Sequence, residues 1–179
     1  MRIHIMGASG AGSTTFGRQL AQKLAIPYFD SDDFFWIKTE PPYQNRRHPD
    51  ERNRLCKAAL AGHPDCILGG SVSNWGDGWE NRFDLVVFLR IPPEIRIERL
   101  RKREFERFGD VILTDGERRK TYEEFIEWAA GYDNDTAQGR TLSSHLNWLR
   151  KVTCPVLTIE GDTTVTERME RVLEVITKS

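Results

Sequence analysis

The sequence lacks the features that mark several classes of protein. Only three of its 179 residues are cysteine, and none stands in a CxxC pair, so neither a disulfide framework nor a zinc site is expected. The formal net charge is −1, which gives no general attraction to nucleic acid or anionic lipid. No apolar run approaches the length of a membrane span. The opening MRIHIM is not followed by the apolar region of a signal peptide, and a cytoplasmic protein is expected.

Short apolar runs alternate with helical patterns along the chain. Strands are expected at residues 2–6, 27–29, 66–68, 85–89 and 156–159. Helices are expected at about 12–25, 50–61, from Pro92 onward and at 165–176, and Pro41 and Pro42 are expected to break the chain. This alternation predicts one α/β domain over residues 1–179, with a parallel sheet and helices on both faces.

One glycine-rich segment carries most of the functional information. Residues Gly7–Thr15 read GASGAGSTT between the first expected strand and helix, which is the setting of a phosphate-binding loop. Such a backbone can aim successive N–H groups at an anion, and the helix N-terminus adds partial positive charge. The residues expected to bind nucleotide are Gly7, Ser9, Gly10, Ala11, Gly12, Ser13, Thr14 and Thr15. The Thr14 hydroxyl stands where loops of this kind hold Mg²⁺.

The loop departs from the pattern G-x-x-x-x-G-K-[ST] at one position, where Ser13 replaces the lysine. A serine donates a neutral hydrogen bond, whereas charge-assisted bonds are roughly twice as strong. The loop is therefore expected to hold ATP less tightly, unless another cation substitutes.

Three aspartates follow the second strand, at the edge of the sheet where ligands bind in such folds. Asp30 is expected to hold Mg²⁺, directly or through water. Asp32 or Asp33 is expected to meet the substrate and to accept a proton from an attacking hydroxyl. The alternative is that this segment only caps a turn.

Further candidates for contact with the substrate come later in the chain. Gly70 and Ser71 follow the third strand, where glycine permits close approach of a ligand. Trp75 either walls a substrate pocket or packs on the core. Arg46 either contacts an anion of the acceptor or lies on the surface.

Arginines on and after the helix that starts at Pro92 are candidates for phosphate contact. Arg99 and Arg103 are four residues apart and share one helix face, where two guanidinium groups can clamp a moving phosphoryl group. The alternative is a solvated helix that neighbouring glutamates neutralise. Residues 104–150 are too polar and too long for a simple connector and predict a helical lid. Arg140 and Arg150 are candidates for an arginine of this lid.

These motifs together resemble the P-loop small-molecule kinases of the adenylate kinase, shikimate kinase and gluconate kinase group, over nearly the whole chain. More narrowly, the chain is similar to a bacterial branch of adenylate-kinase-related or AAA-family ATPases that lacks the loop lysine. The span from Arg99 to Arg103 resembles the R-x-x-x-R that opens the lid in that group. The aspartates Asp30 and Asp32 resemble the D-x-D of shikimate kinase.

The resemblance implies a three-layer P-loop fold whose five parallel strands lie in the order 2-3-1-4-5. It implies an acceptor-binding region near residues 32–80 and a lid at about 104–150. Arg99 would stack near adenine, and Arg103 would approach the transferred phosphate. The implied ligands are ATP, Mg²⁺ and a small-molecule acceptor, with neither nucleic acid nor membrane as a partner. A monomer and a homodimer both stay open.

The expected function is transfer of the γ-phosphoryl group of ATP to a small acceptor. Three aspartates would repel an acceptor phosphate at close range, which favours a hydroxyl acceptor, whereas Arg46 and Arg47 keep a nucleoside monophosphate open. The alternative function is nucleotide binding or ATP hydrolysis with little or no transfer, because Ser13 replaces the lysine.

Overall fold

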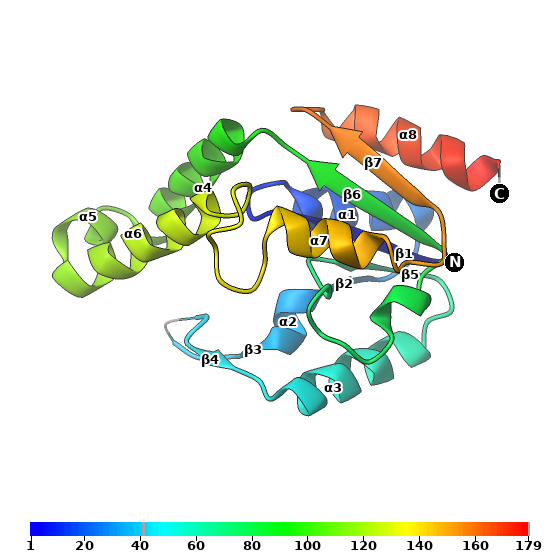
Figure 1. The fold of residues 1–179 in the computed structure, drawn as a ribbon, viewed down its shortest axis with the longest axis horizontal. Coiled ribbons are helices and arrows are strands. Elements are labelled where there is room, and N and C mark those ends of the chain that lie inside the picture. The colour runs from blue at the N-terminus through cyan, green and yellow to red at the C-terminus, as the bar shows by residue number, and fades with distance from the viewer. Residues whose placement is uncertain (41, 179) are drawn as a thin grey trace.

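The computed structural model describes residues 1–40 and 42–178 and has an α/β architecture with helices on both sides of a sheet (Figure 1). The sheet contains β1 (Arg2–Gly7), β2 (Tyr28–Asp30), β5 (Cys66–Gly69), β6 (Leu85–Arg90) and β7 (Val156–Glu160). All neighbours pair in parallel, in the order β2-β5-β1-β6-β7. Two short strands, β3 (Trp36–Ile37) and β4 (Asn45–Arg46), form a separate antiparallel pair. When the strands of the large sheet are counted along the chain, β5, β6 and β7 are its third, fourth and fifth strands. The predicted fold class and the predicted strand order 2-3-1-4-5 are thus confirmed.

Eight α-helices and one 3₁₀ turn connect the strands in the described part of the chain. They are α1 (Ser13–Leu24), α2 (Ser31–Phe35), α3 (Pro49–Ala61), η1 (Trp79–Asn81), α4 (Pro93–Phe108), α5 (Val111–Thr114), α6 (Gly116–Ala130), α7 (Leu142–Leu149) and α8 (Val165–Thr177). Of the two prolines expected to break the chain, Pro42 lies between β3 and β4, and Pro41 lies outside the described residues. No helix of residues 1–40 and 42–178 is long and apolar enough to cross a membrane.

The central strand β1 is buried on both faces, because successive side chains alternate between two apolar layers. Ile3 and Ile5 pack with residues of α1 and α8, such as Phe16 and Val172. Met6 points to the other face and packs with residues of α3, η1 and α7. The parallel register brings the carboxyl ends of the strands to one edge of the sheet, where β1 passes into the turn before α1.

Helices α4, α5 and α6 extend from the body as an arm (Figure 1). Their contacts centre on a small apolar cluster of Leu100, Ile126 and Ala129. Helix α7 then returns to the sheet, where Trp148 belongs to the core cluster and is 6% exposed. The limits 104–150 for a lid stay a prediction, as does the division of the chain into one domain.

Candidate nucleotide and acceptor site

The turn between β1 and α1 forms a loop with a glycine-dependent backbone. Gly10 and Gly12 have φ angles of +83° and +84°, a region that L-residues with a side chain rarely adopt. The N–H of Ala11 donates to the carbonyl of Ala8 at 3.0 Å, which closes the turn. Gly12 is the N-cap of α1 and supplies no side-chain hydrogen bond. The positive end of α1 is thus open to an anion at the edge of the sheet.

Two buried arginines hold this loop from distant parts of the chain. Nη1 of Arg96 in α4 donates to the carbonyl oxygen of Ser9 at 3.0 Å, and Nη2 of the same residue pairs with Asp133. Nη1 of Arg168 in α8 donates to the carbonyl oxygen of Ala11 at 3.1 Å. The two arginines are only 1% and 3% exposed. Both bond to loop carbonyls, and so they fix its shape.

The carboxylate of Asp30 lies directly beside the first turn of α1. The Thr14 hydroxyl and the Tyr28 hydroxyl each donate to Oδ2 of Asp30 at 2.9 Å. Asp30 is also the N-cap of α2, since its Oδ1 accepts the N–H of Asp32 at 3.1 Å. The structure therefore brings together the two residues expected at the metal, Thr14 and Asp30. The segment also caps a helix, as the alternative interpretation expected, but the cap is Asp30 and not Ser31 or Asp32.

The donor set of Thr14 and Asp30 fits Mg²⁺ bound to a nucleotide. This ion takes one or two carboxylates together with waters and phosphate oxygens, and a hydroxyl and a carboxylate 2.9 Å apart supply the protein part of such a set. Among the described residues, no group of three His, Cys, Asp or Glu could hold a metal ion by itself. The arrangement therefore suits an ion that arrives with ATP.

Asp32 lies within electrostatic reach of several predicted site residues. Its pKa is raised above the ordinary value, first because surrounding protein displaces water from the carboxyl and then because Asp30 is negative. Arg140 and Arg103 oppose this rise, and Asp33 adds to it. Asp32 and Asp33 are both exposed residues of α2. An aspartate with a raised pKa is a better proton acceptor than an ordinary one once it is ionised.

The end of β5 is joined to α7 by a chain of hydrogen bonds. The backbone N–H of Gly70 donates to Ile5, and that of Ser71 donates to Oγ of Ser31 at 3.1 Å. The Ser71 hydroxyl lies 2.9 Å from Nε2 of His145, whose Nδ1 lies 2.8 Å from the Tyr132 hydroxyl. Burial lowers the pKa of His145 to about 3, so this imidazole is neutral at physiological pH.

A cation without a counter-ion lies on the side of the predicted acceptor region. The guanidinium of Arg52 in α3 lies over the rings of Trp75 and Phe35, at 4.7 and 5.3 Å from their centroids. The residue is 9% exposed, its Nε has no hydrogen-bond partner, and no carboxylate of the described residues forms an ion pair with it. Trp75 is 7% exposed and belongs to the core cluster, while Arg52 covers one of its faces.

The remaining predicted residues are three arginines outside the loop and two hydroxyl residues within it. Arg46 is exposed in β4 and lies over the rings of Phe35 and Trp36. Arg99 pairs with Asp162, which follows β7, and Arg103 pairs with Glu104. Ser13 is half-buried and Thr15 exposed at the start of α1. None of Arg46, Arg99 and Arg103 donates a hydrogen bond to the loop within the described residues.

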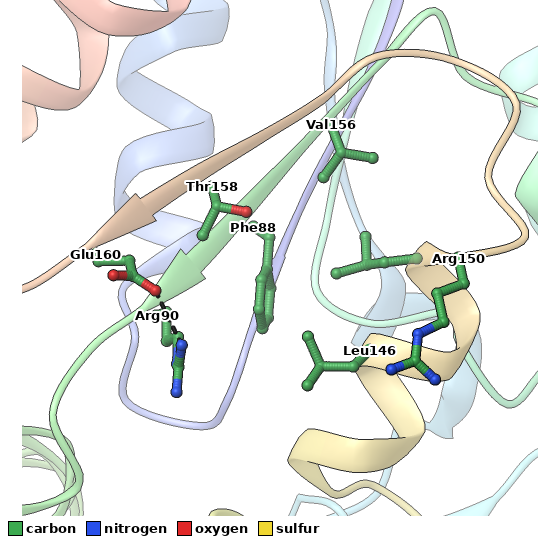
Figure 2. A pocket seen from close by; sticks show the side chains of 8 residues that line it. Phe88, Arg90, Leu146, Arg150, Val156, Thr158 and Glu160 are labelled. Carbon is green, nitrogen blue, oxygen red and sulfur yellow. Dashed lines mark hydrogen bonds and ion pairs between the residues drawn. The ribbon is translucent and has the colours of Figure 1, made fainter.

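The two arginines predicted as candidates for the lid, Arg140 and Arg150, lie at different places in the structure. Nη2 of Arg140 donates to the hydroxyl of Ser9 at 2.7 Å, inside the loop. Arg150 lies at the other end of α7, where Nη1 donates to Asn147. Arg150 is one of the residues that line an open hollow between β6, β7 and α7 (Figure 2). The hollow has a volume of about 350 Å³, and no residue of the loop lines it.

Sequence reasoning did not single out Arg52, Arg96, Arg168 and His145. Arg96 stands three residues before Arg99 in an arginine-rich helix, so nothing in the local pattern separates the buried guanidinium from the exposed ones. Arg168 reaches the loop across 157 positions and Arg96 across 87. Only the packing of α4 and α8 reveals them.

Comparisons with known proteins show which proteins this chain is similar to in sequence. The family model described as "AAA domain" matches residues 3–119. The "Uncharacterized protein YqaC" of Bacillus subtilis (strain 168) is 41% identical over 177 residues, which cover 99% of this chain and 98% of that protein. Shikimate kinase of Bacteroides thetaiotaomicron is 30% identical over 115 residues, 56% of this chain and 63% of that enzyme.

The fold is similar to that of solved shikimate kinases. The enzyme from Acinetobacter baumannii in complex with shikimate superposes with a TM-score of 0.56 at 19% identity, covering 99% of this chain and 93% of the other. At this identity the likeness concerns the fold alone. With a phosphate-binding loop, an aspartate at its side and a family model over most of the chain, the protein belongs to the AAA domain family and is related to the P-loop small-molecule kinases.

Proposed function

We propose that this protein is an ATP-dependent phosphotransferase that acts on a hydroxyl group of a small acceptor. The observation that carries the proposal is the junction of the loop with the aspartates: Thr14 bonds to Asp30, and Asp30 bonds to the backbone of Asp32. A phosphate donor in the loop and an acceptor at Asp32 would then be neighbours. Relatives named shikimate kinase and gluconokinase act on hydroxyl acids by name, which supports this class of acceptor.

Each residue has a simple role in the proposed reaction. The loop and α1 hold the phosphates of ATP, and bound Mg²⁺ would supply positive charge to them. Asp32 accepts the proton of the acceptor hydroxyl, whose oxygen bonds to the γ-phosphorus while the bond from this phosphorus to the β-phosphate oxygen breaks. ADP leaves with that oxygen. The raised pKa of Asp32 suits a proton acceptor that must hold the proton afterwards.

Arg52 supports an acceptor that also carries an anion. A desolvated guanidinium without a carboxylate partner gains a strong interaction from an anionic ligand. Because the guanidinium of Arg52 lies over the ring of Phe35, a residue of α2 as Asp32 is, a hydroxyl at Asp32 and a carboxylate at Arg52 are compatible with one small molecule. A second phosphate close to Asp30, Asp32 and Asp33 would meet three negative charges.

The experiment is an ADP-release assay with Mg-ATP and a panel of acceptors. The panel contains shikimate, gluconate and AMP, with the Asp32→Asn variant as control. We expect ADP release that depends on a hydroxyl acid and falls in the variant. Release with AMP alone would move the acceptor to a nucleoside monophosphate, and tight ATP binding without acceptor-dependent release would refute phosphoryl transfer.

One observation favours a second candidate, a nucleotide-binding protein or an ATPase with little transfer. Ser13 occupies the lysine position of the loop, so the charge normally beside the outer phosphates is absent there. ADP release at the same rate with and without every acceptor would support this candidate.

A further inference from the structure

The loop without a lysine has three arginines at hydrogen-bond distance, and they bond to it in two different ways. Arg96 and Arg168 donate to backbone carbonyls, and each has a further partner, Asp133 for the first and the Thr163 hydroxyl for the second. Loop carbonyls and these further partners therefore engage both guanidinium groups, which hold the shape of the loop. Neither arginine bonds to a side chain of the loop, which the structure describes in full.

Arg140 bonds to the loop through a side chain. Its Nη2 donates to Oγ of Ser9 at 2.7 Å, and no carboxylate of the described residues lies within ion-pair distance of it. Burial lowers the pKa of Arg140, and Arg96 adds to this lowering, whereas the negative charge of Asp32 opposes it. A half-buried cation between a phosphate-binding loop and an aspartate is placed where charge would pass from donor to acceptor.

The segment that carries Arg140 is anchored to the body of the protein. Arg140 precedes Thr141, the N-cap of α7, which forms a capping box with Ser144. One turn later His145 is held by Tyr132 and by Ser71 at the end of β5. The segment between α6 and α7 passes beside the turn that joins β1 to α1 (Figure 1). Helix α7 therefore holds Arg140 at the loop.

The other candidates for this task have carboxylate partners elsewhere. Arg99 pairs with Asp162 and Arg103 with Glu104, and their side chains are 40% and 45% exposed. We infer that Arg140 takes the place of the missing lysine and is the cation that neutralises the outer phosphates of the nucleotide. This inference rests on the nucleotide binding in the proposed function and deepens it.

A cycle of two substitutions tests the inference by calorimetric titration with Mg-ATP. Arg140→Gln keeps a hydrogen-bond donor but removes the charge, and we expect affinity to fall about 10- to 100-fold, the range for a hydrogen bond to a charged group. Ser13→Lys in that background restores most of the loss, since the lysine returns to its usual position. In the wild-type background Ser13→Lys changes the affinity for Mg-ATP less than about threefold, because Arg140 repels the added lysine.

Two further variants separate charge from structure. Arg140→Lys retains the charge and should bind Mg-ATP more tightly than Arg140→Gln. Arg150→Gln changes an exposed arginine at the far end of the same helix and should bind as the wild type does. Thermal denaturation of each variant checks that it is folded.

Three outcomes would overturn the inference. These are wild-type affinity in Arg140→Gln, a loss that Ser13→Lys does not recover, and a gain of tenfold or more from Ser13→Lys alone. The last measurement decides the question even if the Arg140→Gln variant does not fold. Absence of Mg-ATP binding by the wild type would instead refute the proposed function, and so the two failures are distinguishable.

Discussion

The two buried histidines predict a steep loss of stability in mild acid. His4 in β1 and His145 in α7 are both 0% exposed. Burial lowers the pKa of His4 to about 4 and that of His145 to about 3, from 6.5, and the nearby positive charge of Arg140 contributes to the shift at His145. Both rings are therefore neutral in the folded protein across the range in which they become charged in the unfolded chain.

The sign and the magnitude follow from proton binding to the two states. Below pH 6.5 the unfolded chain binds protons that the folded protein does not, so acidification favours unfolding. Between pH 7 and pH 5 each histidine removes roughly 2 kcal/mol from the free energy of unfolding, and the pair removes about 4 kcal/mol. That is a large part of the 5–15 kcal/mol (roughly) that domains possess.

Single substitutions divide the effect between the two sites. His4→Asn keeps a donor near the Leu68 carbonyl, to which Nδ1 of His4 is bonded at 2.9 Å. His145→Gln keeps one polar contact toward Ser71 or Tyr132. Each variant loses some stability at pH 7 but should lose only about half as much as the wild type on going to pH 5.

The assay is urea unfolding at 25 °C at pH 7, 6 and 5, with linear extrapolation to water. The quantity compared is the change with pH within each protein, so the contribution of Asp32, whose raised pKa acts in the opposite direction, cancels between variants. The reasoning is refuted if His145→Gln loses as much stability between pH 7 and pH 5 as the wild type does.

Three more predictions concern the site. Asp32→Asn should lower kcat about 10²- to 10⁴-fold and should remove the acidic limb of the pH profile of kcat/KM. In the wild type the raised pKa of Asp32 places this limb above the pH range of an ordinary aspartate. A limb that persists in the variant would show that another group is the base. Gly10→Ala puts a Cβ 2.6 Å from the backbone oxygen of Arg96 at a φ of +83° and should abolish ATP binding in calorimetry, whereas unchanged binding would contradict the loop geometry. Arg52→Gln should raise the KM of an anionic acceptor about tenfold or more and leave that of ATP unchanged in steady-state kinetics, and an equal rise in both would argue for a structural role.

The sheet and the loop could be predicted from the sequence because their signals are local. Five apolar runs and a glycine-rich turn are visible within a few residues each, and the order of the strands came from the resemblance to a kinase group. The contact between Thr14 and Asp30 also follows, since Thr14 comes after β1 and Asp30 ends β2, and both lie at the carboxyl edge of the same parallel sheet.

The arginines at the loop could not be chosen in the same way. Arg99 and Arg103 share a helix face and a motif, yet they pair with the carboxylates of Asp162 and Glu104 and not with the loop. Arg96 and Arg168 carry no motif, and which of many long side chains reaches the loop depends on how α4 and α8 dock. Trp75 was open between pocket and core, and the structure gives a combination: a core position with a cation on one face.

The hold of α8 on the loop has a consequence for synthesis of the chain. Chains are made from the N-terminus, and their early parts begin to fold first. The segment Gly7–Thr15 leaves the ribosome well before Arg168, the donor to Ala11, because 157 positions separate these two residues. A growing chain therefore contains the loop well before it contains Arg168, so we expect the loop to take its folded shape only after α8 has been made and has docked.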